Sequence, residues 1–170
     1  MLWRWLLKLR EKNKIFDFND VVPQMMSIKK HLSQENAIKL EFDADKSSTK
    51  ENTHLTKVDG NDSNEITVPD NHNIYFIFDK GFKCRYVGKK GDKEGINYRL
   101  KLHLVSNMTD KNKNRTWSCI DKVCDYLNNE SKTLYLITIS VEPSFMAEGV
   151  ESYFIDHFRE KGEADWVKRK

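Results

Sequence analysis

The run from Ile74 to Phe78 consists entirely of β-forming apolar residues, Ile-Tyr-Phe-Ile-Phe. The residues that follow, Asp79 to Phe82, include a glycine and two charged side chains and are typical of a turn. From Cys84 to Val87 an extended pattern resumes. Two β-forming segments joined by a short polar turn predict a β-hairpin.

The predicted hairpin fixes the relative position of two tyrosines. If the turn is centred on Lys80 and Gly81, Tyr75 and Tyr86 face each other across the strands, with their Cβ atoms about 5 Å apart. Two phenols then lie side by side on one face of the hairpin. Such a pair either packs as an ordinary cross-strand aromatic contact or contributes to a site.

The residues after the hairpin predict a compact unit of helices and strands. The segment from Ile96 to Val105 fits a strand, because its apolar residues alternate. It also fits a helix, on which Arg99 and His103 share one face. Apolar residues recur at helical intervals from Trp117 to Leu127 and predict an amphipathic helix. Residues Thr133 to Val141 have the composition of a strand, and a last helix follows them.

The last predicted helix carries a carboxylate at the edge of its apolar stripe. The stripe consists of Met146, Val150, Tyr153, Phe154 and His157. Glu151 lies beside it. Taking a carboxylate out of water without a partner costs several kcal/mol. We therefore expect Glu151 either to bind a metal ion or a cation such as Arg99, or to turn its side chain to solvent.

The residues before the hairpin differ from it in composition. Apolar residues at helical intervals predict short helices within Leu2 to Leu9 and Val21 to Leu40. Residues 43–72 are polar and rich in Ser, Thr, Asn and Asp, which is typical of a linker or a long mobile loop. We therefore divide the chain into a basic, helical N-terminal extension (1–42), a polar linker (43–72) and a domain of ordinary size (73–170).

Positive charge is concentrated in two blocks. Eleven Lys or Arg and three acidic residues lie between Lys80 and Arg115, a net charge of +8 in a chain whose total is +3. The first fourteen residues add another +4. A basic surface attracts polyphosphates by releasing counterions, so we expect a nucleic-acid partner, although a solvated lysine face would have the same charge. The candidates for DNA phosphate contact are Lys80, Lys83, Arg85, Lys90, Lys111, Lys113 and Arg115.

The beginning of the chain and the cysteines bear on its compartment. Arg4 interrupts the apolar opening well before the roughly 7 to 15 residues of a signal peptide, and no run approaches the roughly 20 that span a bilayer. The cysteines, Cys84, Cys119 and Cys124, are odd in number and include no C-x-x-C pair. This pattern argues against a disulfide framework and a zinc ribbon. We expect a cytoplasmic protein without a membrane partner, whose cysteines are small core residues.

Four pieces of the sequence together resemble the GIY-YIG nuclease family. They are Asn73-Ile74-Tyr75-Phe76-Ile77, then Tyr86-Val87-Gly88-Lys89, then Arg99 with His103, and last Ala147-x-x-x-Glu151 with Ile155. Each piece alone is weak, and their order and spacing carry the resemblance. It covers residues 73 to 166 and implies an α+β fold, a small three-stranded antiparallel sheet flanked by helices. It also implies that Ile96 to Val105 is a helix.

The same resemblance implies phosphodiester hydrolysis with one divalent ion, Mg²⁺ or Mn²⁺. Glu151 is the implied metal ligand, Tyr75 orients or deprotonates the attacking water, and Arg99 neutralises the phosphoryl group. Phosphoryl transfer depends mostly on positioning and charge stabilisation, so such a group of residues is sufficient. A tyrosine acts as a base only if neighbouring cations lower its pKa. The remaining implied catalytic residues are Tyr86, His103 and Lys89.

The sequence departs from the family pattern at two positions. Asn73 stands where the family usually has Gly before Ile-Tyr, and Asn tolerates unusual backbone angles. The Asn commonly found about twelve residues beyond the catalytic Glu is missing, with Glu163 at that distance and Asp165 close by. Residues 106–132 also form a longer segment than a minimal core needs. We expect this insertion and the basic N-terminal segment to contact DNA phosphates.

These observations predict a metal-dependent endonuclease of a stand-alone or restriction type, with double-stranded DNA as its expected substrate. We expect a homodimer if it makes double-strand cuts. The alternative is a catalytically inactive nucleic-acid-binding module of the same fold. A third hypothesis is a helical interaction protein in which Trp3 and Trp5 dock on a partner, but it leaves the four motifs unexplained. The nuclease prediction requires Glu151 to lie on the same side of the sheet as Tyr75 and Tyr86.

Overall fold

The computed structural model describes residues 18–44, 53–90, 95–104 and 119–167, which belong to two compact units, 1–36 and 37–170. In the first unit, helix α2 (Phe18–His31) is followed by the short 3₁₀ helix η1 (Gln34–Asn36). Asn36 Nδ2 donates a hydrogen bond to the carbonyl of His31 at 3.1 Å. This bond satisfies one of the carbonyls that a helix end leaves without an intrahelical partner. The helix predicted within Leu2 to Leu9 lies outside the described residues.

The second unit contains a six-stranded antiparallel sheet with the strand order β3-β2-β1-β6-β4-β5. The strands are β1 (Ile38–Ala44), β2 (Thr53–Val58), β3 (Asn61–Asp62), β4 (Ile74–Phe78), β5 (Cys84–Lys89) and β6 (Thr133–Ile139). All five side chains of β4 are buried, because this strand lies between β6 and β5 and is covered on both faces. The predicted hairpin and the predicted α+β class are confirmed.

The prediction of a three-stranded sheet is wrong. Strands β6, β4 and β5 are the three that were expected, and β1, β2 and β3 extend the same sheet beyond β6. The described residues of the segment predicted to be a linker therefore contribute strands, and the helix predicted for Val21 to Leu40 ends at His31. The physical reason is burial: Leu40, Phe42 and Leu55 all lie in the core.

A tight turn at Asp59 and Gly60 joins β2 to β3. Both residues have positive φ, 51° and 79°, and Val58 pairs directly with Asn61. An Asp-Gly pair with positive φ at both positions is the preferred two-residue hairpin turn. Asp59 Oδ1 also accepts a hydrogen bond from the backbone N–H of Lys39 at 2.8 Å, which fastens the turn to β1.

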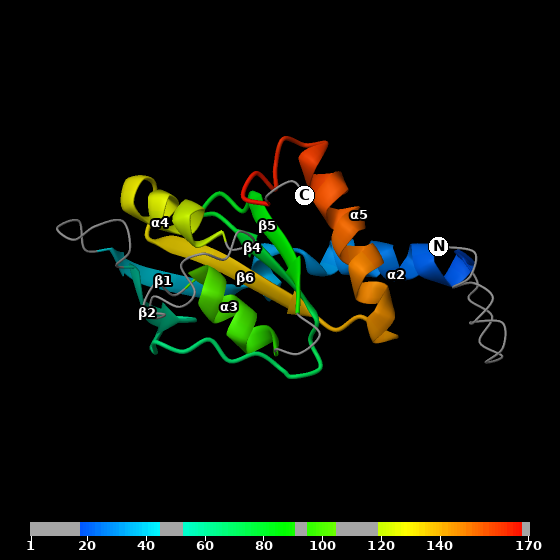
Figure 1. Ribbon diagram of the computed structural model, residues 1–170, viewed down its shortest axis with the longest axis horizontal. Helices are drawn as coiled ribbons and strands as arrows, with labels where there is room; N and C mark the ends of the chain where they lie inside the picture. Colours follow the sequence, from blue (N-terminus) through cyan, green and yellow to red (C-terminus); the bar gives the residue numbers. More distant parts are fainter. Residues whose placement is uncertain (1–17, 45–52, 91–94, 105–118, 168–170) are drawn as a thin grey trace. The chain divides into compact units, whose positions relative to one another are not determined.

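Helices α3 (Ile96–Leu104) and α4 (Ile120–Asn129) lie on the same face of the sheet (Figure 1). The hydrophobic core on this face is made of Leu40, Phe42, Leu55, Ile66, Val68, Tyr75, Ile77, Ile96, Leu100, Leu104, Cys119, Val123, Tyr126, Leu127, Leu134, Leu136 and Trp166. The helix implied for Ile96 to Val105 is thus confirmed over its described residues. Burial of Ile96, Leu100 and Leu104 in this core outweighs the strand-like alternation of the sequence.

Helix α5 (Ala147–Arg159) packs on the opposite face through aromatic rings. The ring of Phe154 meets that of Phe76 edge to face, with centroids 5.2 Å apart. Phe158 makes a similar contact with Phe78, at 6.2 Å. Because side chains alternate along a strand, Phe76 and Phe78 face α5 while Tyr75 and Ile77 face α3 and α4.

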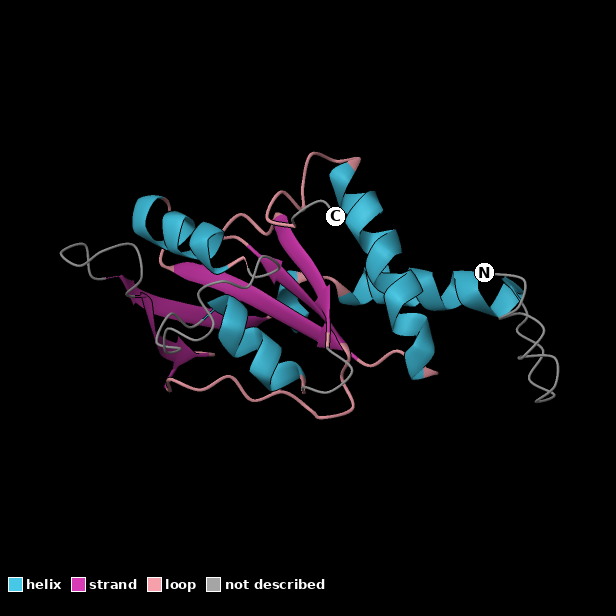
Figure 2. Cartoon of the chain, viewed as in Figure 1, coloured by secondary structure: helices cyan, strands magenta, loops and turns pink. Residues whose placement is uncertain are grey.

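The connection from β3 to β4 runs along α3 (Figure 2). Its side chains Ile66 and Val68 are buried in the core. The side-chain amide of Asn97 on α3 accepts a hydrogen bond from the backbone N–H of Val68 at 3.1 Å and donates one to its carbonyl at 3.4 Å. This connection is therefore part of the fold. Among the described helices, none is long and apolar enough to cross a membrane.

Candidate active site

The two tyrosines of the β4–β5 hairpin lie on the same face but in a different register from the predicted one. Tyr75 pairs with Gly88, and Tyr86 pairs with Ile77. The prediction that the two tyrosines face each other directly is wrong by two residues, because the turn is longer than assumed and the ladder has an irregularity after Ile77. A register shift of two residues leaves both tyrosines on the same face of the sheet, because side chains alternate between the faces with a period of two. The phenol rings are diagonal neighbours, stacked with centroids 6.0 Å apart.

Gly88 provides the space that the tyrosines occupy. A Cβ atom at this position would lie 2.5 Å from Cζ and from Oη of Tyr75, and 2.8 Å from Cε1 of Tyr86. Real Cβ atoms do not approach other atoms so closely, so any side chain here would displace both rings. The missing side chain therefore allows the Tyr75 phenol to lie directly over the backbone of β5.

Glu151 reaches this position from helix α5. Its Oε1 accepts a hydrogen bond from the backbone N–H of Lys89 at 3.1 Å. Helix α5 itself covers the face opposite Tyr75 and Tyr86, so the expectation of one common face does not hold for the helix. The edge position of β5 leaves backbone groups without a sheet partner, which the carboxylate can reach. There the charge of Glu151 lies close enough to both phenols to raise the pKa of each.

His103 extends the cluster on the side of α3. Its ring lies 4.7 Å from the ring of Tyr86 and 5.8 Å from that of Tyr75, centroid to centroid. The Nε2 atom of His103 lies 3.4 Å from Oη of Tyr86. Arg99 lies one turn earlier on the same helix and is partly buried. The structure thus brings Tyr75, Tyr86 and His103 into direct contact.

Burial and charge act on the titratable groups of this cluster. Burial raises the pKa of Tyr75 well above its ordinary value, with further increases from Tyr86 and Cys119 and a decrease from Arg99. Burial also raises the pKa of Tyr86, with Cys119 and the charge of Glu151 acting in the same direction. Both phenols are therefore neutral at pH 7. This favours a hydrogen-bonding role for Tyr75 over a role as base.

His103 is a neutral imidazole for the same reason. Its side chain is 1% exposed, and burial lowers its pKa to about 3, with the charge of Arg99 adding to the decrease. A histidine with so low a pKa is uncharged at pH 7, with a proton on only one of its ring nitrogens. It can therefore both donate and accept a hydrogen bond in the site.

Lys89 contributes its backbone to the site. Its N–H binds Glu151, as described above. By strand alternation its side chain leaves β5 on the face of Val87, opposite Tyr86 and Gly88. This direction gives no support to the proton-removing role that the family resemblance implies for the Lys89 side chain.

Asn73 occupies the position where the family usually has glycine. Its side-chain Nδ2 donates to the carbonyl of Val141 at 2.9 Å, and its Oδ1 accepts from the N–H of Val141, also at 2.9 Å. Its carbonyl accepts a hydrogen bond from the N–H of Lys90 at 3.0 Å. Asn73 is therefore a buried clamp that joins the start of β4 to the segment leading into α5.

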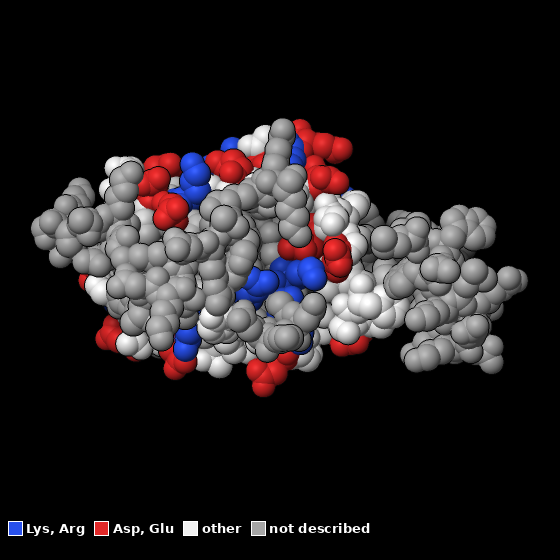
Figure 3. All heavy atoms as spheres, in the orientation of Figure 1, with Lys and Arg blue, Asp and Glu red and all other residues white. Residues whose placement is uncertain are grey.

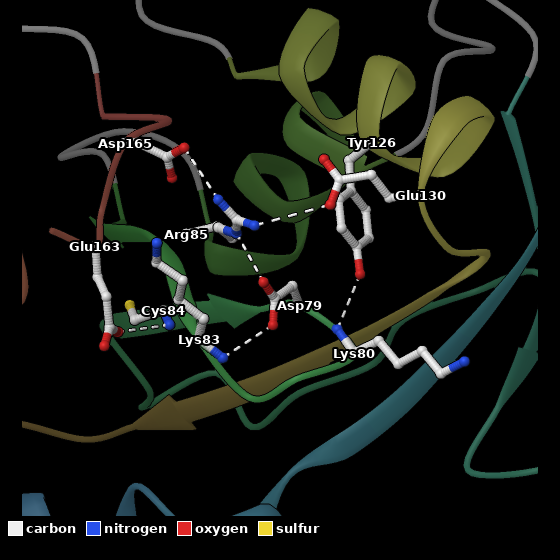
Figure 4. Close-up of polar contacts among 9 residues, drawn as sticks. All are labelled: Asp79, Lys80, Lys83, Cys84, Arg85, Tyr126, Glu130, Glu163 and Asp165. Carbon is white, nitrogen blue, oxygen red and sulfur yellow. Dashed lines mark hydrogen bonds and ion pairs between the residues drawn. The ribbon is translucent and has the colours of Figure 1, made fainter.

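The residues near the position of the missing family Asn lie at another place. Glu163 Oε2 accepts a hydrogen bond from the N–H of Cys84 at 2.8 Å, and Asp165 forms an ion pair with Arg85 at 3.0 Å (Figure 4). Both contacts are at the beginning of β5, whereas Gly88 and Lys89 are near its end. Glu163 and Asp165 thus fasten the C-terminal segment to the edge strand and do not replace the Asn beside Glu151.

Arg85 was a candidate for DNA contact, and the structure surrounds it with carboxylates. Besides Asp165, it pairs with Asp79 at 2.8 Å and with Glu130 at 3.9 Å, and its side chain is 16% exposed (Figure 4). An arginine held in this way has its donors directed at carboxylates. Arg85 therefore supports the fold, and the arrangement does not favour phosphate binding.

The other basic candidates are divided between the two ends of the hairpin. Lys80 and Lys83 lie at the turn, and Lys90 directly follows β5 beside the cluster. The face drawn in Figure 3 has one compact group of Lys and Arg side chains near its middle, with acidic side chains next to it. The candidates Lys111, Lys113 and Arg115 lie outside the described residues.

The cysteines of the sequence, Cys84, Cys119 and Cys124, are all buried, as predicted, and none of the three forms a disulfide. Cys119 has a further contact that the sequence did not indicate. Its backbone N–H donates to Nδ1 of His103 at 3.1 Å, and its Sγ lies 3.3 Å from the same nitrogen. No periodicity or motif marks this contact, because residues 103 and 119 belong to different elements.

Comparison with known proteins gives no further identification. No family model matches the chain, and neither the curated proteins nor the solved structures include a match. The cluster of Tyr75, Tyr86, His103 and Glu151 is therefore the basis for proposing a function.

We predict that Gly88→Ala destabilises the protein by about 1–3 kcal/mol, because the new methyl group overlaps two buried rings. The matched control is Gly149→Ala on α5, where a Cβ meets nothing within 4 Å. This control should stabilise the protein by about 0.5–1 kcal/mol, as alanine does within a helix. Urea unfolding measures both changes, and equal effects would contradict the close packing at Gly88.

We also predict that protonation of His103 destabilises the folded state in acid. The unfolded chain binds this proton near pH 6.5, whereas the folded protein binds it only near pH 3. The unfolding free energy should therefore fall by about 1.4 kcal/mol per pH unit below 6.5 from this group alone. Urea unfolding at pH 7 and pH 4.5 should show a smaller loss for His103→Gln than for the wild type. The same loss in both proteins would refute the low pKa.

Proposed function

We propose that this protein is a metal-dependent endonuclease that hydrolyses phosphodiester bonds in DNA. The observation that carries the proposal is the meeting of two elements at the end of β5. The Tyr75 phenol lies over Gly88, and the Glu151 carboxylate is bound to the next residue, Lys89. Together with the neighbouring Arg99 and His103, these groups supply what phosphoryl transfer requires: a carboxylate, a cation and neutral hydrogen-bonding groups.

Glu151 is the proposed metal ligand. The described residues include no group of three or more His, Cys, Asp and Glu side chains that could enclose a metal ion. A single carboxylate nevertheless fits Mg²⁺, or Mn²⁺, which is often held by one or two carboxylates together with water and substrate phosphates. The hydrogen bond from Lys89 fixes one oxygen of the carboxylate. When bound, the ion would supply Lewis acidity at the scissile phosphate.

The remaining residues have distinct proposed roles. The guanidinium of Arg99 neutralises charge on the phosphoryl group, because a fixed cation stabilises charge that develops in the transition state. Tyr75 orients the attacking water through its neutral hydroxyl, since its raised pKa disfavours ionisation. Tyr86 and His103 hold that hydroxyl in place through their ring contacts.

The second candidate function is a DNA-binding module without catalysis. Two observations favour this function. The Lys89 side chain points away from the phenols, and Glu163, which stands where the family has Asn, binds the N–H of Cys84 at the other end of β5. The site therefore lacks two groups that the family resemblance implies. Binding to phosphates would then rest on the basic residues beside the cluster. The two functions differ in whether DNA is cut.

We predict that the purified protein nicks supercoiled plasmid with Mg²⁺ and that EDTA abolishes the reaction. Glu151→Gln should lose cleavage, because an amide is a poor ligand for a hard cation. Glu148→Gln is the matched control on the same helix, three residues earlier and exposed. It should cut at the wild-type rate.

Agarose gels of plasmid topology measure these rates, and gel-shift assays measure binding. If the wild type cuts nothing while it and Glu151→Gln bind DNA equally well, the binding module replaces the nuclease.

We predict further that Arg99→Ala reduces the cleavage rate by about 10² or more, as loss of a transition-state donor does. Lys101→Ala on the same helix removes an ammonium that pairs with Glu65 at 3.0 Å. This control should retain nearly full activity. Single-turnover rates on a labelled duplex distinguish the two variants, and an unchanged rate in Arg99→Ala would exclude Arg99 from the site.

A further inference from the structure

The imidazole of His103 connects the phenol cluster to the beginning of helix α4. On one side its Nε2 lies 3.4 Å from Oη of Tyr86. On the other side its Nδ1 accepts the backbone N–H of Cys119 at 3.1 Å. His103 itself is almost completely buried, at 1% exposure. Both ring nitrogens therefore have specific partners within the protein.

The partner at Nδ1 decides which nitrogen carries the proton. A backbone N–H only donates, so Nδ1 must be the acceptor and cannot hold a hydrogen of its own. The Cys119 thiol, 3.3 Å from Nδ1, is a second potential donor to the same atom. In a neutral imidazole the single proton is then on Nε2. His103 consequently donates a hydrogen bond to Tyr86 Oη.

The position of Cys119 in the fold strengthens this contact. Cys119 is the N-cap residue of α4 (Ile120–Asn129), so its N–H lies at the positive end of a ten-residue helix. Positive charge near Nδ1 opposes a second proton on the ring. The charge of Arg99 acts in the same direction. A neutral histidine held in one tautomer is a fixed hydrogen-bond donor.

We propose that Cys119 is a positioning residue, whose backbone N–H holds His103 in the tautomer with the proton on Nε2 and thereby orients the Tyr86 hydroxyl. Because Tyr86 Oη accepts from His103, its own proton is directed away from His103, toward the Tyr75 hydroxyl with which Tyr86 shares a side-chain hydrogen bond. In the site proposed above, and resting on that function, the Tyr75 hydroxyl is thereby held where it orients the attacking water. The beginning of helix α4 thus influences the position of the Tyr86 hydroxyl through the side chain of His103.

The tautomer of His103 can be measured by NMR, independently of any cleavage assay. Nitrogen NMR of the wild-type protein should show a proton on Nε2 of His103 and none on Nδ1, with a scalar coupling between Nδ1 and the Cys119 amide nitrogen across the hydrogen bond. Cys119→Ala keeps the backbone N–H and removes the thiol, and it should give the same tautomer. A proton on Nδ1, or a change of tautomer in Cys119→Ala, would overturn the proposal.

The effect on the site is tested with two replacements of His103. A glutamine amide reaches the position of Nε2 and keeps the donor to Tyr86, whereas an asparagine amide reaches only the position of Nδ1. His103→Gln should therefore cleave DNA within about tenfold of the wild-type rate, and His103→Asn should lose roughly 10- to 100-fold in kcat. Plasmid binding should be unchanged in both. Equal rates for the two variants would contradict the role of the Nε2 donor.

The two experiments separate this inference from the proposed function. If the wild-type protein shows the predicted tautomer and coupling but cleaves no DNA, the positioning by Cys119 is supported and the nuclease function is rejected. If it cleaves DNA but carries the proton on Nδ1, the nuclease function is supported and the positioning by Cys119 is rejected.

Discussion

The backbone of β5 at Gly88 and Lys89 is where the two faces of the sheet meet. Because Gly88 has no side chain, the Tyr75 phenol from the α3 face lies against the strand. Because β5 is an edge strand, the N–H of Lys89 is available to Glu151, which comes from the α5 face. A carboxylate on one helix thus approaches phenols that belong to the opposite core. Neither a side chain at Gly88 nor a further strand beside Lys89 would permit this arrangement.

The same packing sets the chemistry of the cluster. Burial keeps Tyr75 and Tyr86 protonated and His103 uncharged, so these residues act through hydrogen bonds. The charged members of the proposed site are Glu151 and Arg99, both partly exposed. Charges in a partly buried site interact more strongly than in water. The proposed reaction therefore depends on placing fixed charges around a phosphate, with the neutral rings as a rigid support.

Sequence reasoning predicted the β4–β5 hairpin, α4, β6 and α5, because each has a clear local pattern. It missed β1 to β3, although Asp59-Gly60 is a strong turn signal, because the surrounding polar residues resemble a linker. The candidates Tyr75, Tyr86 and His103 were found from the sequence, and the structure brings them together. Their register was not predictable, since the ladder irregularity after Ile77 depends on packing. The contact of Cys119 with His103 is set entirely by tertiary structure.

The central claim, that Glu151 can hold a divalent ion beside Gly88, is tested most directly by adding Mn²⁺ to isotopically labelled protein and recording amide NMR spectra. Paramagnetic broadening falls steeply with distance from the ion. We predict that the amides of Gly88, Lys89 and Glu151 broaden first and that Glu151→Gln abolishes the effect. Broadening that begins instead around Asp79 and Asp165, or that persists unchanged in the variant, would contradict it.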